Sequence, residues 1–419
     1  MTTQSLDQPF VATTALRSVN FFNGRLLTGD DLSREQATQA ARLARLGRAA
    51  GDGVAWGFEV VEQPASSSKS QPVVTVSAGL AVSRAGTALE LAADLDVALY
   101  RDATTASSGA ESGNLFADCQ PGAGGTYTAG AGVYLLTVAP NERGEGRAQV
   151  NGLDNDTSTC NVALEAEALA FRLIRLSIAH DELVEKALLR NRIAYACFGT
   201  DAVADAIADP FGTAVTSYGL VDTLRTQTMS DDEVPLAVIG WSIDDGIQFV
   251  DLWSVRRRLT RRAAEGDWIR IVSDRRRAEG EAMVLQFQQQ IAELANEPGA
   301  DLVLATDRFE YLPPVGLLPL AVSVAGGIDS ITFFEGLKPT DAVFVEGAKL
   351  DALVQESFAF PPIDLASDEA IRTYTVRENE QAGGKQPYLV FANGHLPYRG
   401  DAEFDLGYWN FANYAREYC

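Results

Sequence analysis

The sequence predicts an α+β protein in three regions: residues 1–252, 253–300 and 301–419. Three observations predict it. The first region carries short runs of alternating apolar residues separated by Gly, Pro and Ser, which favours a β-sandwich-like domain behind a leading helix. The second is one long helix-forming run rich in arginine, and the third is mostly β, with many prolines and aromatics. A chain of 419 residues also exceeds the size of one ordinary core, so several domains are expected.

The stretch "NFFNGRLLTGDDLSREQ" predicts where the leading helix begins. Its Asn23-Gly24 pair is typical of a turn, which should fold the two apolar residues before it back beside the two that follow. These four residues are Phe21, Phe22, Leu26 and Leu27. Thr28 and Asp31 then form a capping box, which predicts a helix over residues 29–50.

Strands are predicted next. "GDGVAWGFEVV" turns the chain through its glycines into a strand, "VVTVSAGLAVSRAGTALEL" alternates with period two around Ala85-Gly86, and "GVYLLTVAP" is a further strand. "LEAEALAFRLIRLSI" fits either a helix or a strand, and its alternation of apolar residues favours a strand. A helix ending at Gly199 follows, and residues 234–252 predict a hairpin with its turn at Asp244 to Gly246.

The region from Trp253 is predicted to be helical as far as Pro298, with an interruption near Gly266. Met283, Phe287 and Ile291 fall on one face of that helix. They either pack on their own domain or form the seam of a small homo-oligomeric bundle, and the narrowness of the apolar stripe favours the bundle. In the last region, "DAVFVEG", "TYTVREN" and "QPYLVFANG" predict short strands.

Charge is distributed unevenly. The chain has a net charge of -23, which argues against nucleic acid or an anionic membrane as its main partner. Residues 255–277 nevertheless hold nine arginines against three acidic residues. They form either an electrostatic dock for an acidic neighbour, which could be another copy of the chain, or a solvated helix face. The arginines assigned to the dock are Arg256, Arg257, Arg258, Arg261 and Arg262.

Catalytic and metal-binding patterns are poorly represented. The two histidines, His180 and His395, lie in no known motif, and the four cysteines show no metal-ligand spacing. A disulfide between Cys119 and Cys160 stays open. The acidic loop "DNDTS" lacks the glycine and glutamate of a calcium site, and nothing positions a glycosidase carboxylate pair. We therefore expect no cofactor, no metal and no enzymatic activity.

Several stretches resemble a family encoded in contractile injection system gene clusters, whose phage-tail-like machines are built in the bacterial cytoplasm. These stretches are "SVNFFNGRLLTGDDLSREQ", "GVAWGFEV", "SAGLAVSRAGTALEL", "LRNRIAYACFG", "VPLAVIGWSIDDGIQFVDLWSVRRRL" and "ESFAFPPIDL". The chain is more distantly similar to the TssK family of trimeric type VI baseplate adaptors, which also open with an aromatic-Gly-Leu turn, a Gln/Arg-rich helix and a "WGF"-like strand. That similarity implies a shoulder, a helical neck and a head, but the head at 301–419 departs from it.

The resemblance implies a structural subunit at or around the baseplate that acts through protein–protein contacts. Its expected partners are baseplate, sheath or fibre proteins and further copies of the chain, with a trimer favoured and only indirect membrane contact. No apolar run of membrane-spanning length or signal-peptide pattern occurs, so we expect a cytoplasmic protein that joins a phage-tail-like particle. The predicted docking anchors of the first region are Phe21, Phe22, Leu26, Leu27, Trp56 and Phe58.

Two alternatives stay open. The chain could be a receptor- or carbohydrate-binding protein of the tail-fibre type, with Tyr408 and Trp409 of the head stacking on sugars. It could also be a cell-wall hydrolase carried on the same particle. On the leading hypothesis, the head presents an outward contact through its aromatic residues. These are Phe358, Phe360, Tyr388, Tyr408, Trp409 and Phe411.

Overall fold

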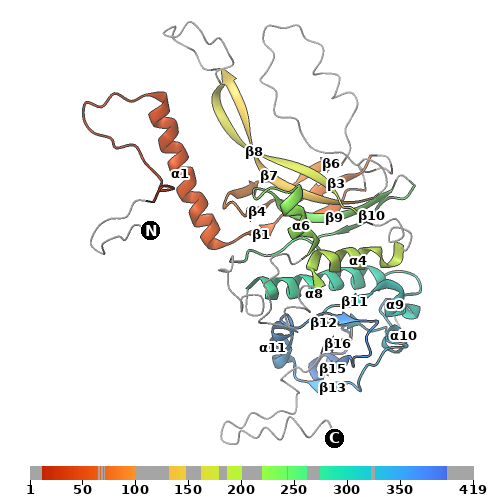
Figure 1. Ribbon diagram of the computed structural model, residues 1–419. Helices are drawn as coiled ribbons and strands as arrows, with labels where there is room; N and C mark the ends of the chain where they lie inside the picture. The colour runs from red at the N-terminus through yellow and green to blue at the C-terminus, as the bar shows by residue number, and fades with distance from the viewer. Residues whose placement is uncertain are drawn as a thin grey trace, which may run out of the picture.

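The computed structural model describes residues 12–64, 67, 69, 71–99, 132–147, 162–178, 186–200, 219–242, 244–261, 274–321 and 326–393. Within these ranges, eight α-helices and sixteen strands form several mostly antiparallel sheets, which confirms the predicted α+β class. Figure 1 shows the first sheets stacked above two long helices, with a further sheet below them and the first helix standing away from the body.

Three sheets build the N-terminal region. One three-stranded sheet contains β1 (Gly53–Gly57), β4 (Gly79–Val82) and β5 (Ala88–Leu91). The other contains β2 (Val60–Glu62), β3 (Val73–Val76) and β6 (Leu95–Ala98). The third sheet has the order β10-β9-β7-β8, with β7 at Gly132–Arg147, β8 at Val162–Arg175, β9 at Val234–Ser242 and β10 at Gly246–Asp251. The β9–β10 hairpin and the strand at β8 confirm the sequence predictions.

The larger sheet is buried on both faces. Because side chains of a strand alternate between faces, Tyr134 and Leu136 of β7 enter the core shared with the two small sheets. Val133 and Leu135 enter a second core, formed with α4 (Lys186–Phe198) and α6 (Leu220–Gln227). The apolar run at residues 133–138 of β7 therefore reflects a part of the strand with no solvent face, whereas residues 141–146 are exposed.

The C-terminal region is a second α+β unit. Its sheet has the order β12-β16-β15-β13, with β12 at Val315–Pro319, β16 at Tyr388–Ala392, β15 at Arg372–Val376 and β13 at Val343–Val345. A separate pair joins β11 (Tyr311–Leu312) to β14 (Ile363–Asp364). The helices are α8 (Asp274–Leu294), α9 (Ala305–Arg308), α10 (Ser330–Phe333), α11 (Gly347–Ser357) and α12 (Arg377–Gln381). The strands predicted in "DAVFVEG", "TYTVREN" and "QPYLVFANG" are confirmed as β13, β15 and β16, although α12 takes the end of the second.

Residues 253–261 are not helical, which corrects the prediction of a helix beginning at Trp253. This segment lies along β1 instead. Thr260 forms a bridge with Asp52, and the amide of Val54 donates to the carbonyl of Arg257 at 2.9 Å. The exposed edge of β1 needs hydrogen-bond partners, and this tertiary pairing outweighs the helix propensity of the arginine-rich run.

The face of α8 predicted to form an oligomer seam is buried inside the chain. Met283 packs against α4. Phe287 and Ile291 lie in the C-terminal core, where the Phe287 ring contacts those of Phe309 and Phe391 at centroid distances of 5.4 and 5.2 Å. The packing interpretation is therefore confirmed and the seam is wrong, because α8 lies between α4 on one side and β12 on the other.

None of the helices in the described part of the chain combines the length and the apolar character needed to span a lipid bilayer.

Candidate functional site

The N-terminal segment lies along α1 (Gly29–Ala50). The Thr38 hydroxyl donates to the carbonyl of Arg17 at 3.0 Å, and the amide of Val19 donates to a Glu35 carboxylate oxygen at 2.9 Å. That amide hydrogen bond is the main reason why the pKa of Glu35 is lowered. The segment therefore runs back along the helix toward its N-terminal end.

The turn and the helix start are formed as predicted. Gly24 adopts a φ of 90°, and the amide of Arg25 donates to the carbonyl of Phe22 at 3.2 Å, which closes the turn. Thr28 and Asp31 form the capping box, and Arg25 pairs with Asp31 at 2.7 Å. These contacts place the apolar residues of the turn beside the N-terminal end of α1.

Five large apolar side chains are exposed at this end of α1. Their exposed fractions run from 47% for Leu27 to 86% for Leu26. We call the five the tip surface: Phe21, Phe22, Leu26, Leu27 and Leu32. Trp56 of β1, another predicted anchor, is also exposed. Grouped apolar side chains on a protein surface make this end of the helix a candidate docking site.

The tip surface lies at the far end of a helix that stands away from the sheets (Figure 1). Among the residues of α1, only Thr38 is buried. Near the other end of the helix, Ala44 and Gly47 approach the backbone of Gly86 so closely that a Cβ at Gly47 would collide with it. The helix is thus anchored near its C-terminal end and free along its outer face.

Phe58 and Arg256 have internal roles, which corrects their prediction as interface residues. Phe58 follows Gly57, and both adopt left-handed backbone angles, with φ of 54° and 63°. This bend buries the Phe58 ring completely in the N-terminal core. The Arg256 guanidinium donates to the carbonyl of Gly57 at 2.6 Å and to that of Phe58 at 3.2 Å. A buried arginine therefore holds a backbone shape that costs a phenylalanine about 1–2 kcal/mol.

Arg257 is also turned inward, which corrects its assignment to an external dock. Its guanidinium donates to the carbonyls of Trp253 and Ser254 and lies 4.8 Å from the centroid of the Phe198 ring. Arg258 is exposed and pairs with Glu281 at 2.7 Å. Arg261 is exposed too, and Arg262 lies outside the described residues. These arginines therefore mostly bind other parts of the same chain.

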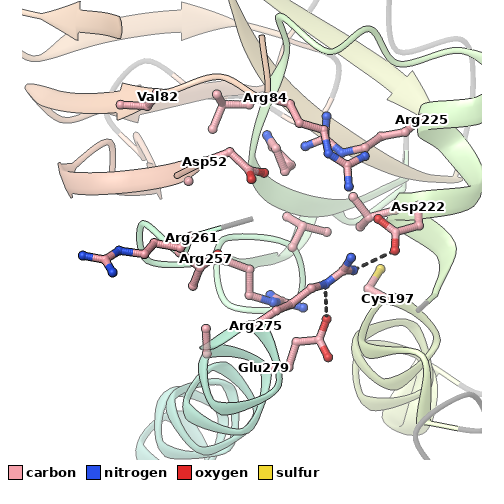
Figure 2. A pocket seen from close by; sticks show the side chains of 17 residues that line it. Asp52, Val82, Arg84, Cys197, Asp222, Arg225, Arg257, Arg261, Arg275 and Glu279 are labelled. Atoms are coloured by element: carbon pink, nitrogen blue, oxygen red, sulfur yellow. Dashed lines mark hydrogen bonds and ion pairs between the residues drawn. The ribbon is translucent and has the colours of Figure 1, made fainter. Parts of the chain in front are cut away.

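A pocket of about 220 Å³ lies where β1, α4, α6 and α8 meet the segment 253–261. We call it the arginine pocket, because five arginines and three acidic residues line it (Figure 2). These residues are Arg84, Arg225, Arg257, Arg261, Arg275, Asp52, Asp222 and Glu279. From the sequence alone, only Arg257, Arg261 and Arg275 stand out, because they belong to the arginine-rich run 255–277. Most of the others come from segments far apart in the chain.

On one side of the arginine pocket, an arginine is paired with two acidic residues. Arg275 pairs with Asp222 at 2.7 Å and with Glu279 at 3.0 Å, as the dashed lines of Figure 2 show. Burial raises the pKa of Glu279. Its second carboxylate oxygen, Oε2, is buried without a hydrogen-bond partner.

Cys197 lines the same pocket, and burial raises the pKa of its thiol to about 12. Because the thiolate is the reactive form, the folded protein should alkylate at Cys197 about a hundredfold or more slowly than the urea-unfolded chain at pH 8. Peptide mapping after iodoacetamide treatment measures this site separately from the other cysteines. Equal labelling rates in the folded and unfolded chain would contradict the burial of this thiol.

No set of three His, Cys, Asp or Glu side chains suited to a metal ion occurs among the described residues. Several residues considered from the sequence lie outside them. These are Cys119, Cys160, Cys419, His180, His395, Tyr408, Trp409, Phe411 and the "DNDTS" loop. Of the remaining head aromatics, Phe358 is buried in the C-terminal core, while Phe360 and Tyr388 are half-buried.

Comparison with protein-family models gave no match. No curated protein matched the chain either. Among solved structures, one match is described as "Crystal structure of TssK", with a TM-score of 0.26 and 10% sequence identity. The match covers 68% of this chain and 52% of the TssK chain, so the chain spans about half the length of that protein. This is a distant similarity, and at such a TM-score it carries no argument about function.

Proposed function

We propose that the chain is a structural, non-enzymatic subunit of a bacterial contractile injection system, at or around the baseplate. The resemblance of several sequence stretches to a family of contractile injection systems is the reason for assigning the chain to such a machine. The tip surface supports a role in docking. Five large apolar side chains lie exposed at the end of a capped helix that projects from the body (Figure 1). We propose that they dock on another subunit of the same assembly.

The energetics favour a docking role. Burying one exposed Phe or Leu side chain contributes about 1.5–3 kcal/mol, so the five together could supply much of the affinity of a stable contact. The capping box and the Arg25–Asp31 pair hold the turn in place before binding. Preorganisation of this kind lowers the entropy cost of association.

The outer face of α1 suits a helical partner. Leu32, Leu43 and Leu46 are exposed, and at 100° per residue they fall within about 60° of one another around the helix. Positions 32, 36, 39, 43 and 46 alternate in steps of four and three, with Gln36 and Gln39 in the middle. This is the spacing of a coiled-coil seam with polar layers that fix register. We propose that the same helix of further copies packs here, giving a homo-oligomer with a trimer favoured.

The test replaces Phe21→Ser and Phe22→Ser together and follows incorporation into the particle by co-purification. We expect at least a tenfold loss of incorporation while the melting temperature stays within about 2 °C of wild type, because both rings are exposed in the isolated subunit. The matched control is Phe344→Ser, an exposed phenylalanine of β13, which should incorporate normally. Wild-type incorporation of the double variant would refute docking through the tip surface.

The same preparations test the oligomer. Light scattering on Leu43→Gln with Leu46→Gln should report monomers where the wild type reports a larger species. A wild type that is itself monomeric would exclude the α1 seam. The two alternative functions, a carbohydrate-binding fibre protein and a cell-wall hydrolase, stay predictions that a glycan array and peptidoglycan zymography can test.

A further inference from the structure

On one side of the arginine pocket two arginines lie near Asp52 without forming an ion pair with it. Arg84 comes from the turn between β4 and β5, and Arg225 comes from α6. Figure 2 shows the two guanidinium groups beside each other, on the opposite side of the pocket from the Arg275 ion pairs. Burial, and next to it the charge of Arg84, lowers the pKa of Arg225, while Asp52, Asp222 and Asp231 act in the opposite direction.

Among the described residues, no carboxylate lies within ion-pair distance of Arg84 or Arg225. Arg84 Nε is buried without a hydrogen-bond acceptor, and Arg225 Nη1 reaches only the carbonyls of Ser230 and Glu233, at 3.5 and 3.4 Å. Buried donors are nearly always paired in folded proteins, so Arg84, which lines the pocket, has a donor that the described residues leave unsatisfied.

Within the described ranges, Arg275 differs from Arg84 and Arg225 in having acidic ion-pair partners. That arginine is held between Asp222 and Glu279, so the chain supplies carboxylates where it needs a structural ion pair. Among the described residues it supplies no ion-pair partner for Arg84 or Arg225. Two neighbouring cations repel each other, and an anion bound between them would relieve that repulsion.

We propose that the arginine pocket binds a small phosphate-class anion between Arg84 and Arg225. The planar forks of two arginines match the oxygens of a phosphate group, which accepts several charge-assisted hydrogen bonds at once. The pocket volume of about 220 Å³ is several times the roughly 30 Å³ of a liquid water. It is smaller than pockets for drug-sized molecules, which start at about 300 Å³. Inorganic phosphate or a compact phosphate ester therefore fits, and this assignment is independent of the proposed function.

The test is calorimetric titration of the full chain with inorganic phosphate, with pyrophosphate and with glycerol phosphate, each at matched ionic strength. We expect one site per chain for phosphate, and the ranking of the three probes separates a free-phosphate site from an ester site. Arg84→Gln should weaken binding about tenfold or more, since it removes charge-assisted hydrogen bonds worth about one decade or more in affinity. Arg84→Lys, which keeps the charge but loses the fork, should retain part of it.

The matched control is Arg277→Gln, which removes the same charge from an exposed position of α8 outside the pocket. Its affinity should equal that of wild type. Circular dichroism confirms that each variant is folded before titration, and Arg225→Gln provides a second pocket variant. The proposal is overturned if wild type binds none of the three probes at millimolar concentration. It is equally overturned if Arg84→Gln binds as tightly as wild type.

Discussion

Replacing Asp251 with alanine is expected to destabilise the protein by about 3–5 kcal/mol. Asp251 is fully buried at the end of β10, and it accepts hydrogen bonds from Arg190 of α4 at 2.9 Å, from Gln286 of α8 at 2.9 Å and from the amide of Ser254 at 3.0 Å. Its removal leaves the buried Arg190 guanidinium with only Glu293, which is half-exposed. An uncompensated charge at this depth costs far more than the lost hydrogen bonds alone.

Urea unfolding followed by far-UV circular dichroism measures the effect. Arg190→Ala should cost a similar amount, and the double variant should cost much less than the sum, because the two residues act as one unit. The control is Lys338→Ala, which breaks an exposed pair with Asp368 and should change the free energy of unfolding by less than about 1 kcal/mol. A loss below about 1 kcal/mol for Asp251→Ala would mean that this network does not hold α4, β10 and α8 together.

The second large effect is expected for Phe287→Ala, at about 3–5 kcal/mol. Phe287 is 1% exposed, and its ring lies between those of Phe309 and Phe391 in the C-terminal core. Truncation leaves a cavity that the surrounding rings and the backbone of α8 cannot fill.

Thermal unfolding and light scattering together decide what Phe287 does. The variant should melt earlier while keeping the oligomeric state of wild type below its transition. Phe344→Ala, an exposed phenylalanine of the same region, should melt within about 2 °C of wild type. Dissociation of Phe287→Ala without loss of stability would restore the oligomer seam that the packing of α8 excludes.

Local signals allowed much of the secondary structure to be predicted. The capping box of Thr28 and Asp31 lies within one helical turn, and it set the start of α1 correctly. The turn at Asp245 and Gly246 lies between two apolar runs, and it located the β9–β10 hairpin. Signals of this kind depend only on a few neighbouring residues, so contacts made elsewhere in the fold do not change the structure that they predict.

Residues 253–261 could not be predicted in the same way. Their arginines and leucine favour a helix locally, but their backbone hydrogen bonds are made to β1, about two hundred residues earlier in the chain. Phe58 and Trp56 illustrate the same limit. They lie two residues apart in one motif, yet the left-handed bend at Gly57 and Phe58 buries one ring and leaves the other exposed.

The two candidate sites differ in the same way, because one is local in sequence and the other is not. The tip surface lies within one short stretch of sequence, and four of its five residues, all except Leu32, are predicted as docking anchors from the sequence. The arginine pocket joins Arg84, Arg225 and Arg275 from three separated segments, and only folding brings them together. Of these, only Arg275 belonged to a visible charge run, and it is the one whose charge the chain itself neutralises.

The helix α1 is attached to the body near its C-terminal end. At Gly51, with a φ of 120°, the chain passes so close to the backbone of Thr260 that any side chain there would collide with it. The helix is held at this contact and again where Ala44 and Gly47 meet Gly86, so its free part from Gly29 to Ala44 is about 23 Å long at 1.5 Å per residue. A bend of about 10° at Ala44 would therefore move the distal end by about 4 Å. Because Thr260 also lines the arginine pocket, one backbone segment forms both the contact that holds the base of α1 and a wall of that pocket.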